Sequence, residues 1–472
     1  MLRKIAAALI LASLAPGLPM SQVFAAPSEP APGSIEYWKR ELANQHFGFG
    51  NLREQRATPG FGAAVNAERF RLKALWRDES YGAFKGRPRF TLALTGIDFL
   101  LGAPWRNETL WAGSHERIHV LNRWGAKLTA DLWGPPDLFT AGERRPVVVI
   151  TTGSIQANAR MYFWAAQTLA EAGYVAITYD VQGQGESETF GHRDTGQIWC
   201  GAVDQSDLPV FLREIGPCPG FPFQQPANFG GGAVGMHNFA LSTPQDPWEH
   251  HSAGTGTAPF NPWHEYVDGT RVGAAGHSFG AAAVSFLQAH PELLREPVKA
   301  IVAWDGLSTC QTRSDCQPSN VNAPLVPALD LRNDYFFAWL TILSPPNPQN
   351  SLDAFDHWRE AGVDTATIAL RGGTHMEYTS VPNNILGATR YGQDLAAHYT
   401  LAWFDRYLRD DPSASERLLA REVTFTHIDP VGRPDPEVTT LAVSDFASFY
   451  NRSGVFVDGT CRRDWKHDTE IC

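Results

Sequence analysis

Two short apolar segments, with a segment of helical spacing between them, constrain the fold of this chain more than any other feature. Residues 147–150 are three valines and an isoleucine, a run typical of a strand buried on both faces of its sheet. Residues 162–172 then show helical spacing and end at Gly173, a common helix stop, before a second apolar run at residues 174–179. Strand, helix and strand in this order predict parallel strands joined by a right-handed crossover. The sequence therefore predicts an α/β protein with a mostly parallel central sheet flanked by helices.

The same alternation continues along the 472 residues. Further strands are predicted at residues 127–133, 272–275, 300–304, 325–331 and 367–370, and further helices at residues 281–289 and 394–408. The pattern predicts a core domain at residues 122–412, an N-terminal extension at residues 27–121 that packs on it, and a C-terminal segment at residues 413–472.

One stretch inside the core departs from this alternation. Residues 188–268 are rich in Gly, Pro, Asn and His. Long loops in compact enzymes are usually lids or binding loops. We therefore expect residues 188–268 to form a lid-like insertion, with one helix near residues 233–242.

The N-terminus has the pattern of an export signal. Arg3 and Lys4 precede a short apolar run at residues 5–14, and small residues at Ala25 and Ala26 offer a cleavage site. The run is too short to span a bilayer comfortably, and the later apolar runs are also shorter than a membrane span. We expect residues 1–26 to be a signal peptide, the mature protein to be secreted or periplasmic, and the chain to have no stable membrane span.

Six cysteines agree with an oxidising compartment, where disulfides persist. Proximity in the sequence favours the pairs Cys200–Cys218, Cys310–Cys316 and Cys461–Cys472, and the lack of a Cys-x-x-Cys motif argues against a metal site. The formal net charge of −11 argues against nucleic acid as a partner, because phosphate binding needs clustered Lys and Arg.

The segment Gly276-His277-Ser278-Phe279-Gly280 lies between a predicted strand and a predicted helix and matches the pattern G-x-S-x-G. In this context the pattern indicates a nucleophile elbow, a tight turn that holds the serine hydroxyl above the sheet. The flanking residues must be glycine because a side chain would clash within the turn. The N-terminus of the following helix favours developing negative charge. Ser278 is therefore the candidate nucleophile.

A serine hydroxyl needs a base to take its proton, and the expected order along the chain is serine, acid, histidine. His375 follows a predicted strand directly and is the candidate base. Asp305 and Asp334 each lie at the end of another predicted strand and are both candidates for the acid, with Asp330 as a third. All three positions are near the carboxyl edge of the sheet, where such sites form.

Two backbone N–H groups are expected to stabilise the oxyanion of the reaction. One belongs to Phe279, the residue after the nucleophile, and the other to Ser154, in the turn after the strand at residues 147–150. Acyl transfer by such a triad needs neither a cofactor nor a metal ion, so neither is expected.

Three further motifs precede the elbow: Gly173-Tyr174-Val175, Tyr179-Asp180 and Gly183-Gln184-Gly185-Glu186-Ser187. With them, residues 127–408 resemble the α/β-hydrolase superfamily, which implies an α/β-hydrolase fold. The elbow, together with Val302-Ala303-Trp304-Asp305 and Arg371-Gly372-Gly373-Thr374-His375, resembles the platelet-activating-factor acetylhydrolase and polyester-hydrolase-like group.

That resemblance also bears on the acid. In the acetylhydrolases the acid follows the strand after the nucleophile helix, which favours Asp305 over Asp334. Two features depart from the family pattern: Thr152-Gly153 replaces the usual His-Gly, and the loop after Ser187 is long. Both departures affect the expected substrate rather than the type of reaction.

Together these residues predict an exported serine hydrolase of the esterase or lipase type, which cleaves carboxylic esters through an acyl-enzyme on Ser278. The expected substrate is a small-molecule, lipid-like or polyester ester. A serine peptidase or amidase on the same scaffold is the alternative, because both reactions use one acyl-transfer mechanism. A non-catalytic binding protein with a relic elbow is a third interpretation, disfavoured by the intact Ser278, His375 and carboxylates.

Overall fold

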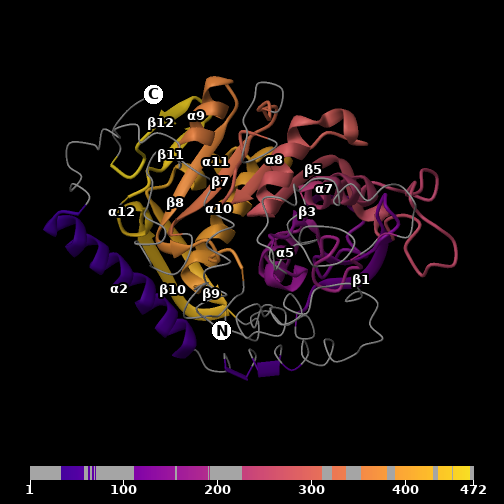
Figure 1. Cartoon of the computed structure of the whole chain (residues 1–472), viewed down its shortest axis with the longest axis horizontal. Coiled ribbons are helices and arrows are strands. Elements are labelled where there is room, and N and C mark those ends of the chain that lie inside the picture. Colours follow the sequence, from indigo (N-terminus) through magenta and orange to yellow (C-terminus); the bar gives the residue numbers. More distant parts are fainter. Residues whose placement is uncertain are drawn as a thin grey trace, which may run out of the picture.

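A computed structural model gives the fold of the chain (Figure 1). It describes residues 33–57, 62–63, 66–67, 70, 111–154, 157–189, 191, 226–310, 321–335, 352–379, 389–428, 434–448, 450–467 and 472. The predicted signal peptide, residues 192–225 of the predicted insertion, and the cysteines Cys200, Cys218 and Cys316 lie outside the described residues.

A ten-stranded mixed sheet forms the centre of the molecule, in the order β1-β2-β4-β3-β5-β6-β7-β8-β11-β12. Its six middle strands are parallel: β4 (Val175–Tyr179), β3 (Arg145–Thr151), β5 (Val267–His277), β6 (Ala300–Trp304), β7 (Ala328–Tyr335) and β8 (Thr365–Thr374). Antiparallel strands complete both ends: β1 (Ser114–Leu121) and β2 (Lys127–Gly134), and β11 (Gly454–Val457) and β12 (Thr460–Arg462). The predicted α/β arrangement is thus confirmed, with a sheet that is mixed.

The sheet reaches past both ends of the predicted core. β1 lies within the predicted N-terminal extension and pairs along its whole length with β2. β11 and β12 lie within the predicted C-terminal segment, and β11 pairs with β8. The two outer segments of the chain therefore supply edge strands to the same sheet.

β7 starts and ends later than the sequence indicated. The predicted strand covered residues 325–331, whereas β7 runs from Ala328 to Tyr335. Pro324 and Pro327 have no N–H to donate to a ladder, so regular pairing starts only after them. The shift places Asp334 inside the strand instead of in the loop that follows.

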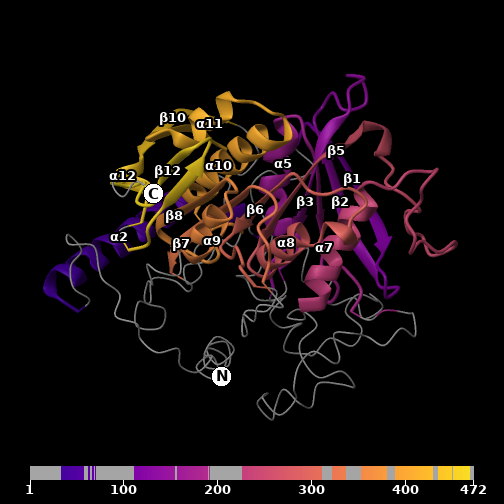
Figure 2. The same ribbon diagram turned by 90° about the horizontal axis from the view of Figure 1, so that it is seen from above.

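Helices cover both faces of the sheet, as the view from above shows (Figure 2). One face carries α5 (Phe163–Glu171) and α10 (Arg390–Leu408), and the other carries α7 (Pro226–Ala240), α8 (Phe279–Ala289) and α9 (Asp353–Glu360). α7 is the helix expected near residues 233–242, and it starts earlier, with Pro226 in its first turn. Because α7 packs on α8 and β3, this described part of the predicted insertion belongs to a helical layer.

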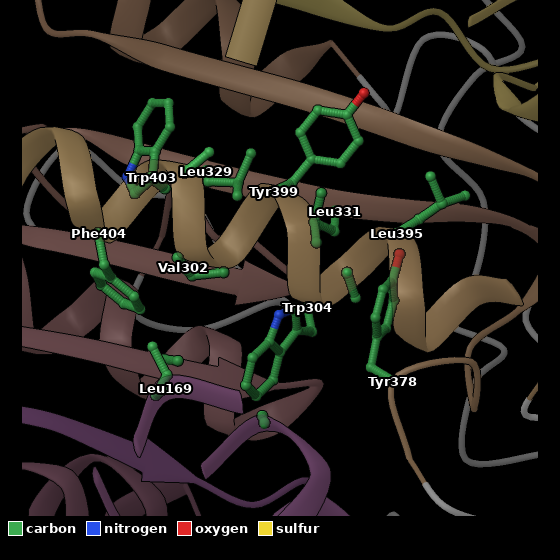
Figure 3. Close-up of a cluster of buried hydrophobic side chains, with 14 of the residues drawn as sticks. Leu169, Val302, Trp304, Leu329, Leu331, Tyr378, Leu395, Tyr399, Trp403 and Phe404 are labelled. Carbon is green, nitrogen blue, oxygen red and sulfur yellow. The ribbon is translucent and has the colours of Figure 1, made fainter. Parts of the chain in front are cut away.

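Two hydrophobic cores fill the space between the sheet and its helices, because successive side chains of a strand point to opposite faces. Along β3, Val148 belongs to the core under α5 and α10, whereas Val149 belongs to the core under α7 and α8. Figure 3 shows the first of these cores, in which Tyr399 and Trp403 of α10 lie with Leu329 of β7. The packed strands provide a rigid support for the turns at their ends.

The N-terminal helix α2 (Ile35–Ala57) lies at the margin of the molecule and contacts β8 and α10 (Figure 1). Its buried Glu41 accepts hydrogen bonds from the hydroxyl of Tyr335, at 2.8 Å, and from that of Tyr450. Its buried Asn44 donates to Asp334 Oδ2 at 2.7 Å. α2 is therefore attached to the sheet through buried polar groups.

The C-terminal segment adds α11 (Ser413–Leu419), a separate two-stranded sheet of β9 (Glu422–Ile428) and β10 (Pro434–Ala442), and the short α12 (Val443–Phe446). Short 3₁₀ helices lie at Ala159–Tyr162, His264–Tyr266 and Pro291–Leu293. The predicted Cys461–Cys472 disulfide is confirmed, with 5.4 Å between the Cα atoms. Cys310 is also disulfide-bonded. None of the helices that the structure describes is long and apolar enough to cross a membrane.

Candidate active site

Ser278 lies in a strained turn between β5 and α8. Its backbone dihedral angles are φ 57° and ψ −116°, a conformation that L-residues rarely adopt. Strain of this kind costs roughly 1–3 kcal/mol and is typical of functional sites. The surrounding packing holds the turn, since its backbone N–H donates to the carbonyl of Trp304 at 3.0 Å. The local geometry is that of the expected nucleophile elbow.

The two glycines of the motif are required by backbone contacts. A Cβ atom on Gly276 would lie 2.2 Å from the carbonyl oxygen of Gly280. A Cβ atom on Gly280 would lie 2.2 Å from the carbonyl oxygen of Thr151, at the end of β3. Because both obstacles are backbone atoms, no side-chain movement can relieve the clash. The elbow therefore packs directly on the turn that follows β3.

Gly276→Ala is expected to lower the free energy of unfolding by about 2–4 kcal/mol, the size of a severe overpacking effect. Gly230→Ala, in α7, is a matched control, because its Cβ would meet Phe286 at an ordinary 3.5 Å. The control should be neutral or slightly more stable, since alanine favours the helix. Urea denaturation of both variants measures the difference, and equal stabilities would contradict the steric argument.

His375 and Asp305 are brought together by the ends of β8 and β6. The Nδ1 atom of His375 lies 2.5 Å from Oδ2 of Asp305. A carboxylate only accepts hydrogen bonds, so Nδ1 carries the proton and Nε2 is the basic nitrogen of the neutral ring. The backbone fixes both residues: the N–H of Asp305 donates to Leu331 O at 2.6 Å, and that of His375 donates to Tyr335 O at 2.8 Å.

The other two candidate acids, Asp334 and Asp330, bond other groups instead of His375. Asp334 accepts hydrogen bonds from Asn44, from the backbone N–H of Gly372, at 2.8 Å, and from the side chains of Ser448 and Asn451. Asp330 forms a salt bridge with Arg332, with 2.5 Å between Oδ2 and Nε. Of the three carboxylates, Asp305 is the one that bonds His375.

Asp305 is suited to holding a charged imidazole. Its burial acts to raise the pKa of the carboxyl group, but the hydrogen bond and charge of His375, with the charge of Arg332, outweigh burial and hold that pKa below its usual range. Asp305 is therefore ionised at neutral pH. An ionised carboxylate on Nδ1 orients the ring and stabilises it when Nε2 gains a proton.

The two expected oxyanion donors lie at the elbow and at the turn after β3. Phe279 is the first residue of α8, where N–H groups have no partner within the helix. Ser154 is partly exposed and follows Gly153, which is fixed on both sides. The N–H of Gly153 donates to the hydroxyl of Tyr162 at 3.0 Å, and its carbonyl accepts from Gln184 Nε2 at 2.8 Å. The turn that carries Ser154 is thus held by side chains.

Two residues at the site were not found from the sequence. His277, inside the elbow motif, bonds the backbone carbonyl of His375 through Nε2 at 2.7 Å. Its Nδ1 lies 2.8 Å from the hydroxyl of Tyr162. Both side chains are buried. A variable position in a motif and a tyrosine in a helical segment carry no local signal for such contacts.

Glu377 was also not found from the sequence. Its buried carboxyl group accepts from the backbone N–H of Thr389 at 3.0 Å and bonds the hydroxyl of the same threonine, which is the N-cap of α10. Burial raises the pKa of Glu377 to about 8, despite these hydrogen bonds. Glu377 therefore connects the turn of His375 to the start of α10 as an uncharged group at neutral pH.

Stability should fall as pH rises because of Glu377. In the unfolded chain the group loses its proton near pH 4.5, and in the folded chain near pH 8, so protonation favours the folded state and its contribution is lost across this interval. Glu377→Gln removes the titration. The melting temperature of the variant, minus that of the parent, should increase from pH 5 to pH 8. A difference that does not change with pH would contradict the assignment.

Within the described residues, no group of three His, Cys, Asp or Glu side chains is placed to hold a metal ion. No protein-family model matches the chain, and no curated protein matches it. The chemistry of the site is therefore inferred from its own geometry.

Proposed function

We propose that the chain is an exported serine hydrolase of the α/β-hydrolase superfamily that cleaves carboxylic esters. One observation carries the proposal: Ser278 in its strained strand-to-helix turn lies beside the turns of Asp305 and His375, which are bonded to each other. The order serine, aspartate, histidine along the chain is that of this superfamily. The parallel strands with helices on both faces also support an α/β-hydrolase fold.

In the proposed reaction, Nε2 of His375 takes the proton of the Ser278 hydroxyl while Oγ bonds to the ester carbonyl carbon. The backbone N–H groups of Phe279 and Ser154 stabilise the negative charge that develops on the carbonyl oxygen. His375 then gives the proton to the alcohol oxygen as the carbon–oxygen bond breaks, which leaves an acyl group on Ser278. Water, deprotonated by His375, attacks this acyl carbon, and the acid and the free serine are released.

The substrate class and the location of the protein are proposed from the sequence. The resemblance to the platelet-activating-factor acetylhydrolase and polyester-hydrolase-like group supports a small-molecule, lipid-like or polyester ester as substrate. The positive start and short apolar run of residues 1–26 support secretion or periplasmic export. The described Cys461–Cys472 disulfide agrees with an oxidising compartment.

Turnover of p-nitrophenyl esters from acetate to palmitate, beside a matched p-nitroanilide, tests the proposed function on the mature protein. We expect ester hydrolysis, and covalent labelling by a fluorophosphonate at Ser278. Comparable kcat/KM values for the anilide and its ester would favour the peptidase or amidase instead. A folded protein that neither hydrolyses an ester nor reacts with the fluorophosphonate would reject a serine hydrolase of either kind.

A further inference from the structure

A chain of hydrogen bonds through two buried side chains links three turns of the candidate site. It starts at the backbone N–H of Gly153, which lies 3.0 Å from the hydroxyl oxygen of Tyr162. That oxygen lies 2.8 Å from Nδ1 of His277, and Nε2 of His277 lies 2.7 Å from the carbonyl oxygen of His375. The side chains of Tyr162 and His277 are 0% and 2% exposed, so water does not compete for these bonds.

For a neutral His277 ring, the direction of every bond in this chain follows from its partners. The carbonyl of His375 can only accept, so Nε2 of His277 carries the proton of the neutral ring and Nδ1 is an acceptor. The hydroxyl of Tyr162 must then donate to Nδ1, and its oxygen accepts from Gly153. Burial raises the pKa of Tyr162 above its usual range, which keeps this donor protonated. The Tyr162 hydroxyl thus donates to His277 and accepts from Gly153.

The chain joins three turns of the proposed catalytic site. Gly153 precedes Ser154, His277 precedes Ser278, and the last acceptor is the backbone of His375 itself. We propose that Tyr162 and His277 are positioning residues, which fix the nucleophile, the base and the second oxyanion donor relative to one another. This inference rests on the proposed function, because it concerns the alignment of that reaction.

The hydroxyl of Tyr162 can be separated from the packing of its ring. The ring lies parallel to that of Trp304, with an interplanar angle of 7° and 6.3 Å between centroids. Tyr162→Phe keeps this packing and removes only the hydroxyl. Gly153 then loses its acceptor and Nδ1 of His277 loses its donor, so the two turns are no longer joined by a directed bond.

Tyr174→Phe is the matched control. Tyr174 is also 0% exposed, and its hydroxyl donates to Asp405 Oδ1 at 2.6 Å. It precedes β4, at the edge of the parallel strands opposite to the carboxyl ends where Ser278 lies. The two substitutions therefore remove the same atom from equally buried rings, one inside the proposed site and one remote from it.

The experiment compares kcat, KM, the rate of fluorophosphonate labelling and the melting temperature of the two variants with those of the parent protein. For Tyr162→Phe we expect kcat and the labelling rate to fall by about 10- to 100-fold with little change in KM, the size of effect seen when a supporting contact is lost. Tyr174→Phe should lower the melting temperature and leave kcat within about two-fold, since its lost bond is stabilising only.

A second pair of variants tests His277 by rescue. Glutamine can donate to the carbonyl of His375 and accept from Tyr162, whereas leucine can do neither. His277→Gln should therefore retain more kcat than His277→Leu at similar KM. Equal kcat in Tyr162→Phe and the parent, or equal losses in Tyr162→Phe and Tyr174→Phe, would overturn the inference while the parent remains an esterase. An inactive, unlabelled parent protein would instead reject the proposed function, and the inference with it.

Discussion

Ser278→Ala is expected to lower kcat for a p-nitrophenyl ester by about 10⁶-fold, the loss found when the nucleophile of a serine hydrolase is removed. The variant keeps its oxyanion donors, so a small rate above that of water should remain. Its stability should change little, because the Ser278 side chain makes no capping hydrogen bond to α8 and alanine is smaller by a single oxygen atom. Steady-state kinetics and circular dichroism on the same preparation check both statements.

Ser285→Ala is the matched control for this prediction. Ser285 lies in α8, next to the elbow, and its hydroxyl donates to Ala281 O at 2.8 Å and accepts from the N–H of Ser308 at 3.0 Å. Its loss should reduce stability by about 1–3 kcal/mol, because the N–H of Ser308 loses its acceptor, and leave kcat almost unchanged. Turnover that survives in Ser278→Ala would rule out Ser278 as the nucleophile.

Asp305→Asn is expected to cause the second largest effect, a loss of about 10⁴-fold in kcat. Asparagine has nearly the same shape, but its amide can donate to Nδ1 of His375 and so hold the ring with its proton on Nε2. That ring cannot take a proton from Ser278, and the charge that would stabilise the imidazolium is also missing. The pH dependence of kcat should change together with its size, because the base then titrates without its carboxylate.

Asp334→Asn tests whether Asp334 is the acid of the triad or a carboxylate that only stabilises the fold. Asp334 accepts from Asn44, Gly372, Ser448 and Asn451, so an amide in its place meets donors and should lower stability. Its kcat should stay near that of the parent protein in folded material. The reverse pattern, with a folded but inactive Asp334→Asn and an active Asp305→Asn, would assign the acid to Asp334.

The parts of the molecule that local patterns could predict are those with a local cause. Apolar runs of four to six residues predicted β3 and β4, because a strand buried on both faces needs apolar residues throughout. The elbow motif predicted the turn at Ser278, because the clash that requires Gly276 arises within a few residues of the chain. His375 and Asp305 were candidates because each directly follows a predicted strand, and the structure places them in contact. The alternation of strands and helices was therefore enough to bring candidate groups to one edge.

What the sequence left open depends on contacts between distant residues. The bond of Tyr162 to His277 joins positions 115 residues apart, and that of His277 to His375 joins positions 98 residues apart. The contact of His375 with Asp305 joins positions 70 residues apart, and the positions of the candidate carboxylates in the sequence did not show which of them His375 would meet. Neither spacing nor composition contains that information. The strands β1, β11 and β12 were not expected: β1 carries mostly polar residues in its first half, and β11 and β12 are only four and three residues long.

The buried hydrogen bonds of α2 can form only late in the synthesis of the chain. Glu41 accepts hydrogen bonds from the hydroxyls of Tyr450 and Tyr335, which lie 409 and 294 residues later in the sequence. While the chain is being made, Glu41 leaves the ribosome long before either tyrosine exists. The complete set of buried bonds of this helix can therefore form only after the last part of the chain is made, an order that is compatible with the proposed export. The N-terminal helix can therefore attach to the sheet in full only when synthesis of the C-terminal segment is nearly finished.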